Sequence, residues 1–225
     1  MSNSSNYTKD VVVFFDGLYK YKVCAYSFKG HNTKSNNKIV LSDNELNEGF
    51  EHIKKTNKRL NRNILNAAPY TKNLIARDWF QVKYADTIFA VGNIETPSTV
   101  QGGTGYACSC AVDEKKPIYF FEQNDNQWYY YDYQSDKFEI YEGIPKLTEN
   151  FAGIGTRDIN DNGVKAIISL TGVCVHTPVK FIPNYLTYIE NIEFKTDNLL
   201  LIVGSPIGSK NLFIIDKKVT SNCSS

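Results

Sequence analysis

A cluster of glycines around a threonine is the part of the chain best suited to binding chemistry. Gly102, Gly103, Thr104 and Gly105 give the letters GGTG, and small apolar residues at helical spacing follow them. Glycine permits positive φ angles and lets the backbone approach a ligand closely. Backbone amides at the start of a helix form an anion site, because their donors are unpaired and the helix dipole favours negative charge. The segment therefore predicts a phosphate-binding turn, although the same glycines could serve only close packing of a strand on a helix.

The elements that must position this turn form a strand–helix–strand unit. Residues 86–92 (DTIFAVG) and 118–121 (IYFF) are short apolar runs typical of buried strands. Residues 93–101 form a polar loop before the glycines, and residues 106–115 form a helix that Pro117 stops. The crossover of such a βαβ unit is almost always right-handed. Ligands of open α/β sheets bind at the carboxyl ends of the strands, which is where the GGTG turn would lie.

Polar side chains at the ends of these strands are the next candidates. Thr104 could donate its hydroxyl to a phosphate oxygen or cap the following helix. Glu95, in the polar loop, could accept ribose hydroxyls, or could act as the catalytic residue at an anomeric carbon. Glu122 and Gln123 end the second strand and could contact a sugar or a base edge, whereas Asp86 begins the first strand. For Asp86 the alternative is capping, and for Glu122 and Gln123 it is the solvated polarity of a strand end.

A second glycine segment carries an arginine. Gly155, Thr156 and Arg157 follow an apolar run and lie in a polar turn. A guanidinium group at such a turn is suited to bidentate recognition of a phosphate or a carboxylate. Arg77 is a further ligand-binding candidate, although an arginine within a helix commonly pairs with a neighbouring acid. Ser27 completes the set, because it lies at the carboxyl end of a predicted strand.

The remaining patterns predict helices and strands on both sides of this unit. Ser42 and Glu45 form a capping box at the start of a helix. The aromatic letters WYYYDY of a predicted hairpin could stack a base, although such clusters more often belong to a core or an interface. The expected elements are strands over 11–15, 22–28 and 151–155, helices over 43–61, 71–84 and 163–170, and a hairpin of 127–133 with 138–141.

Together these elements predict an α/β protein with a Rossmann-like, mostly parallel sheet, flanking helices and an inserted β-hairpin. We expect residues 1–21 to form an N-terminal lead with one strand and residues 22–172 to form the Rossmann-like domain. Residues 173–225 are expected to form a small β-rich C-terminal appendage. Its runs NLLLIVG and NLFIIDK are typical of two strands joined as a hairpin.

Composition argues against several classes of function. The 225 residues carry a formal net charge of +1, which argues against the clustered basic face that binds nucleic acids. No apolar run approaches the roughly 20 residues of a membrane span, and the polar N-terminus lacks the apolar core of a secretory signal. The five cysteines are odd in number, so we expect packing thiols in a reducing compartment, the cytoplasm. The three histidines show no metal spacing, and we expect neither a metal nor a cofactor.

Two motifs of the chain resemble sequence motifs of the SLOG superfamily, which includes the Lonely-Guy-type phosphoribohydrolases and the DNA-processing protein. The first is GGTG followed by a helix. The second is Gly155-Thr156-Arg157, which resembles the G-[ST]-R signature that opens many SLOG domains. The strand–GGTG order is also similar to that of nucleoside deoxyribosyltransferases. Because GTR follows GGTG in this chain, the resemblance implies a Rossmann-like domain in which the order of the motifs is rearranged.

The resemblance implies a ligand that is a nucleotide or a nucleotide-derived sugar phosphate. The Lonely-Guy pattern continues to a glutamate on the helix, whereas residues 106–111 of this chain contain no acid. That difference favours a sensor or sequestering module that binds without turnover. The alternatives are a hydrolase or transferase that acts on an N-glycosidic bond through Glu95, and a structural protein that forms homo-oligomers through its aromatic hairpin.

Overall fold

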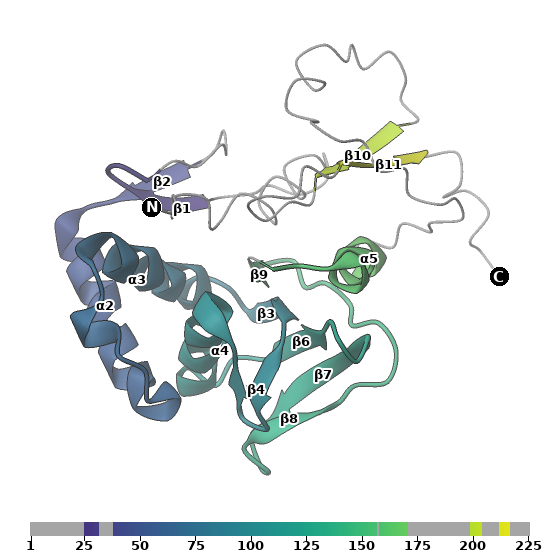
Figure 1. Ribbon diagram of the computed structural model, residues 1–225, viewed down its shortest axis with the longest axis horizontal. Helices are drawn as coiled ribbons and strands as arrows, with labels where there is room; N and C mark the ends of the chain where they lie inside the picture. Colours follow the sequence, from purple (N-terminus) through teal and green to yellow (C-terminus); the bar gives the residue numbers. More distant parts are fainter. Residues whose placement is uncertain (1–24, 32–37, 157, 171–198, 204–211, 217–225) are drawn as a thin grey trace.

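The centre of the structure is one five-stranded sheet (Figure 1). The structure is a computed structural model that describes residues 25–31, 38–156, 158–170, 199–203 and 212–216. Together with its flanking helices, the sheet confirms the predicted α/β class. In the order in which they lie side by side, the strands are β8 (Lys137–Ile140), β7 (Gln127–Asp132), β6 (Ile118–Glu122), β3 (Thr87–Gly92) and β9 (Phe151–Gly155).

The sheet is mixed, with a parallel half and an antiparallel half. Strand β3 pairs in parallel with β6 and β9, and the predicted strand–helix–strand unit is confirmed. Strands β7 and β8 form the predicted hairpin, which is confirmed, but they continue the sheet in the antiparallel sense, so the expectation of a mostly parallel sheet was wrong. The reason is the short turn at residues 123–126, which allows no crossover and therefore places β7 antiparallel to β6.

Three helices cover one face of the sheet, and a fourth covers the other (Figure 1). On the first face, α2 (Asp43–Leu60), α3 (Pro69–Lys83) and α4 (Gly102–Asp113) share a core with Ile88. On the second face, α5 (Asp161–Leu170) packs in a core with Phe89. Alternating residues of β3 thus meet different helices, which explains why all of β3 is buried.

The starts of α2 and α3 follow from their first residues. The amide of Glu45 donates to Ser42 Oγ at 3.3 Å, and the amide of Ser42 donates to Glu45 Oε2 at 2.7 Å, so the predicted capping box is confirmed. Helix α3 begins at Pro69, two residues earlier than predicted. Proline suits the first turn of a helix, where its missing N–H would have no intrahelical partner.

The largest local difference from the sequence-based prediction precedes the GGTG letters. The predicted polar loop is a small antiparallel hairpin of β4 (Ile94–Thr96) and β5 (Thr99–Val100). The amide of Gln101 donates to the carbonyl of Asn93 at 2.9 Å, which closes this hairpin. The chain then passes directly into α4 (Gly102–Asp113), so the glycines lie within the first helical turn and not in a separate turn before it.

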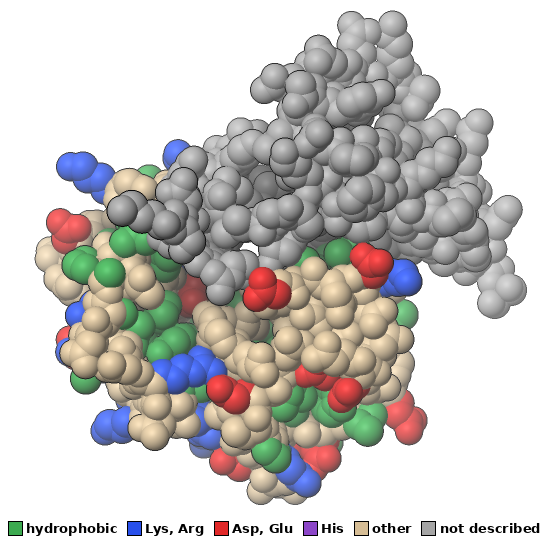
Figure 2. Space-filling view, in the orientation of Figure 1, with side chains coloured by type: hydrophobic (Ala, Val, Ile, Leu, Met, Phe, Trp, Pro, Cys, Tyr) green, Lys and Arg blue, Asp and Glu red, His purple; other side chains and the backbone are tan. Residues whose placement is uncertain are grey.

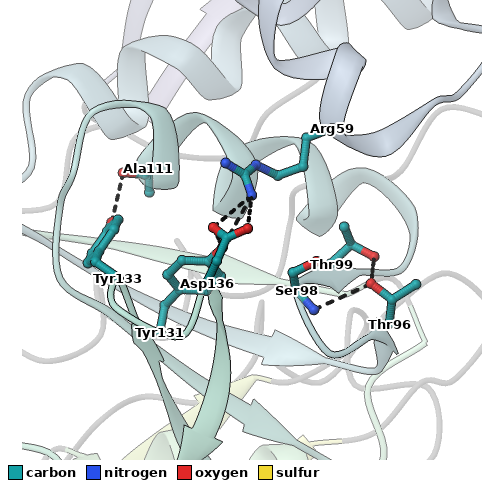
Figure 3. A network of polar contacts seen from close by, with 8 residues as sticks. All are labelled: Arg59, Thr96, Ser98, Thr99, Ala111, Tyr131, Tyr133 and Asp136. Atoms are coloured by element: carbon teal, nitrogen blue, oxygen red, sulfur yellow. Dashed lines mark hydrogen bonds and ion pairs between the residues drawn. The ribbon is translucent and has the colours of Figure 1, made fainter.

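A polar cluster anchors the β7–β8 hairpin to α2 (Figure 3). Arg59 Nη1 donates to Asp136 Oδ1 at 3.1 Å and to the Tyr131 hydroxyl oxygen at 3.2 Å, and that hydroxyl donates to Asp136 at 2.6 Å. Burial raises the pKa of Tyr131. Trp128 and Tyr131 are both buried, so these two members of the aromatic segment belong to the core and are not free to stack a base.

Two smaller sheets and a short 3-10 helix complete the described elements. Strand β1 (Ala25–Phe28) lies within the predicted strand over residues 22–28 and pairs in parallel with β2 (Lys38–Leu41), a strand that was not predicted. The predicted strand over residues 11–15 lies outside the described residues. The expected C-terminal hairpin is confirmed as β10 (Leu199–Val203) and β11 (Leu212–Asp216), and η1 spans Ile64–Asn66. Across the described residues, none of the helices has the length and apolar character needed to cross a membrane.

Candidate functional site

The two glycine motifs, which are some fifty residues apart in sequence, meet at one edge of the sheet. The hydroxyl of Thr104 donates to the carbonyl oxygen of Gly155 at 3.2 Å. The amide of Thr156 donates to the carbonyl of Val91 at 2.9 Å. These bonds place the start of α4 beside the carboxyl ends of β3 and β9. The structure therefore brings together the predicted residues of the GGTG segment with Gly155 and Thr156.

The first turn of α4 is open to solvent and is not capped by a side chain. Gly102 and Gly103 are exposed, and a Cβ atom on either would have no neighbour within 4 Å among the described residues. Gln101 has an extended backbone and precedes the helix without a side-chain hydrogen bond to it. Gly102 has a φ angle of 63°, in the region that favours glycine. Backbone amides at such a start are suited to an anion.

The hydroxyl of Thr104 and the lack of a side chain at Gly105 both serve the packing of α4. Thr104 is buried, and its hydroxyl donates to the carbonyl of Gly155 and does not cap the helix. A Cβ atom on Gly105 would lie 2.8 Å from Arg62 Nη1 and closer still to the carbonyl oxygen of Val100. Gly105 is therefore needed for the close approach of α4 to β5, which was the alternative role of these glycines.

Arg62 links the start of α4 to the β4–β5 hairpin, and sequence reasoning missed it. Its guanidinium group donates to the carbonyls of Gly102 at 2.7 Å and Val100 at 2.6 Å, and it forms an ion pair with Glu95. The arginine lies two residues after α2, in a polar segment that carries no motif. Glu95 is thus held beside the α4 start by a residue that only the three-dimensional structure identifies.

An open groove of about 490 Å³ lies next to the α4 start, between the β4–β5 hairpin and the turn after β6. Glu95 and Gln101 line one side, and Asp125 and Tyr129 line the other. Figure 2 shows acidic and hydrophobic side chains next to one another over the region where Figure 1 draws β4, β7 and β8. In the part of the chain that the structure describes, no group of three acidic, histidine or cysteine side chains could hold a metal ion.

Glu122 lies at the base of this groove and joins its two sides. Its side chain is only 5% exposed, and its carboxylate accepts hydrogen bonds from the amide of Ile94 in β4 and from the amide of Asn124 in the turn, the latter at 3.0 Å. Two hydrogen bonds from backbone N–H groups offset much of the free energy that it costs to bury a carboxylate. Glu122 therefore links the β4 side of the groove to the turn after β6.

The side chain of Gln123 holds the loop between β9 and α5. Its side chain is 3% exposed, with Nε2 donating to the carbonyl of Asp158 at 2.9 Å and Oε1 accepting from the amide of Asn160 at 2.9 Å. These bonds fix the segment between β9 and α5. The expected contact of Gln123 with a sugar or base edge is not supported, because both ends of its amide are occupied by the backbone.

The other predicted site residues lie apart from this edge or outside the described chain. Asp86 precedes β3 at its amino end, where its amide donates to Asn150, so it is at the end of the strand opposite to the α4 start. Ser27 and Arg77 belong to another cluster, in which Arg77 Nη1 donates to the carbonyl of Tyr26 at 3.3 Å. Arg157 lies outside the described residues.

The second cluster contains a buried histidine. Ser27 Oγ lies 3.0 Å from His31 Nδ1, and both side chains are buried. Burial, together with the positive charges of Arg77 and Lys38, lowers the pKa of His31 from 6.5 to about 4. The imidazole is therefore neutral in the folded protein at physiological pH.

We expect this histidine to make the protein less stable in acid. Because the folded-state pKa is depressed, the unfolded chain binds the proton more readily, and stability is lost as pH falls from about 6.5 towards about 4. Between about pH 7 and about pH 5 the free energy of unfolding should fall by about 2 kcal/mol through this group. Urea unfolding of the wild type and His31→Gln at both pH values measures it. Equal pH dependence in the two proteins would contradict the assignment.

The cysteines of α4 fit the expected packing role. Cys108 and Cys110 are free and buried, and burial raises the pKa of each thiol to about 12. A thiol with so high a pKa is a poor nucleophile, since the thiolate is the reactive form. Neither thiol is therefore a candidate nucleophile for the site.

Comparison of the chain with protein-family models, curated proteins and solved structures finds no match.

Proposed function

We propose that the protein binds a nucleotide or a nucleotide-derived sugar phosphate, whose phosphate lies on the amides of the first turn of α4. The observation that carries this proposal is the start of α4: two exposed glycines, no side-chain cap, and a position at the carboxyl ends of parallel strands. Such a start supplies unpaired donors and a favourable dipole for an anion. We interpret the parallel half of the sheet as a Rossmann-like domain of the SLOG type, with the protein in the cytoplasm.

Phosphate-bearing nucleotides should stabilise the protein against heat, and the matching nucleosides should stabilise it much less. At a ligand concentration ~100 times the dissociation constant, binding adds about 2.7 kcal/mol to the free energy of unfolding. Thermal unfolding with nucleosides and with their mono-, di- and triphosphates tests this. Equal shifts from nucleoside and nucleotide would remove the phosphate from the proposal.

A pair of substitutions at one exposed position locates the phosphate. Gly103→Asp adds a carboxylate to the first turn of α4, where it competes with the phosphate for the same amides, and we expect affinity to fall at least about tenfold, or ~1.4 kcal/mol. Gly103→Ala is the matched control, because its Cβ has open space and it adds no charge. Equal affinities of the two variants would place the phosphate elsewhere.

A second candidate function is cleavage or transfer of an N-glycosidic bond. The observation that favours it is the place of Glu95, which lines the groove beside the α4 start. A carboxylate in that position could act at an anomeric carbon whose phosphate lies on α4. Chromatography of each stabilising nucleotide after incubation distinguishes the two functions, since turnover releases a free base and binding leaves the nucleotide intact.

A further inference from the structure

The groove has the chemistry of a sugar site, and we propose that it binds the hydroxyl-bearing ring of the ligand, a ribose or a similar sugar. This inference rests on the proposed function, because the phosphate on α4 is what brings the ring to the groove. It assigns a role to a surface made by the β4–β5 hairpin and the turn after β6, which no motif in the sequence marks.

The groove is formed before any ligand arrives, because three kinds of contact hold its sides. Glu122 accepts from amides on both sides, as described above. The amide of Phe138 donates to the carbonyl of Pro97 at 2.7 Å, which joins the tip of the β4–β5 hairpin to β8. Arg62 holds the other end of that hairpin through Val100 and Glu95. A preformed site does not have to be ordered when the ligand binds, so less affinity is lost.

The lining offers sugar hydroxyls both acceptors and donors next to an aromatic ring. Glu95 and Asp125 supply carboxylate oxygens, Gln101 and Asn124 supply amides, and the ring of Tyr129 supplies an apolar surface for C–H groups. The hydroxyl of Tyr129 donates to Asp125 Oδ2 at 3.2 Å, which fixes both side chains. A hydrated cation would gain little from this aromatic surface, whereas a sugar ring presents both hydroxyl and C–H groups.

Charge sets the direction in which the ligand lies. Glu95, Glu122 and Asp125 all line the groove, and their carboxylates repel a phosphate. The first turn of α4 attracts one, and Gln101 borders both places because it lines the groove and immediately precedes the helix. The phosphate therefore lies on α4, and the uncharged ring extends from it into the groove.

The test compares ribose 5-phosphate with inorganic phosphate by isothermal titration. We expect the wild type to bind ribose 5-phosphate at least about tenfold more tightly than inorganic phosphate. Asp125→Asn and Tyr129→Leu should reduce this ratio to about two or less, and affinity for inorganic phosphate should stay the same. Glu139→Gln is the matched control, because Glu139 lies in the same hairpin sheet, pairs with Lys137 and does not line the groove.

The outcomes separate this inference from the proposed function. Retained binding of inorganic phosphate with an unchanged ratio in Asp125→Asn and Tyr129→Leu overturns the sugar site alone. Failure of both compounds to bind the wild type overturns the phosphate site, and the sugar site with it. Circular dichroism confirms folding of each variant, and Asp125→Asn keeps the test decisive if Tyr129→Leu does not fold, because Asp125 is exposed in a turn.

Discussion

Replacing Gly105 with alanine should destabilise the protein by about 3 kcal/mol, because the added methyl group has no room. The new Cβ would lie 2.8 Å from Arg62 Nη1 and would clash with the carbonyl oxygen of Val100. A backbone carbonyl cannot move aside without disturbing β5, so α4 must shift away from the hairpin. Urea unfolding followed by circular dichroism measures the loss.

Gly103→Ala is the control for this substitution within the same helical turn. A Cβ at Gly103 has open space around it, and alanine is the better helix former. We therefore expect no loss, or a gain of up to about 1 kcal/mol. If the two glycine substitutions cost the same, the close approach of α4 to β5 is not the reason for Gly105.

Replacing Glu122 with alanine should cost about 3 kcal/mol, because two backbone amides lose a charged acceptor in a buried place. The amides of Ile94 and Asn124 would be left without the carboxylate that now binds them. Glu122→Gln should cost less, since its amide oxygen can still accept one of the two bonds. Urea unfolding measures stability, and hydrogen exchange at the Ile94 amide reports the local effect.

Glu139→Ala is the surface comparison for Glu122→Ala. Glu139 is partly exposed and pairs with Lys137, and such pairs contribute little to stability. We expect a change within about 0.5 kcal/mol. A loss at Glu139 as large as that at Glu122 would mean that the hairpin, and not the buried carboxylate, accounts for the effect.

The elements that depend on local pattern could be predicted from the sequence. The capping box at Ser42 and Glu45 marks the start of α2, and the apolar runs of β3 and β6 are long enough to identify buried strands. Three features were missed because they depend on contacts between segments. The strands of the β4–β5 hairpin are short and largely polar, and the parallel β1–β2 pair has weak patterns. Helix α4 begins in glycines, which are poor helix formers in isolation.

The candidate site was predicted in part. The carboxyl-end position of the GGTG segment and its meeting with Gly155 follow from the topology of parallel strands. The roles of Thr104 and Gln123 could not be predicted, because a polar side chain near a strand end can turn inward to the backbone as easily as outward to a ligand. Arg62 lies more than thirty residues from Glu95 in sequence, and nothing local indicates that pairing.

The bond between Thr104 and Gly155 also bears on when the site forms during synthesis. Chains emerge from the ribosome from the N-terminus, and α4 can pack on α2 and α3 before β9 exists. The edge of β3 beside α4 stays open until residues 151–155 have been made and paired with it. A nascent chain that ends before Gly155 therefore carries the GGTG segment without the strand edge to which Thr104 donates, so the proposed ligand site is complete only after residue 155 has been made and β9 has paired.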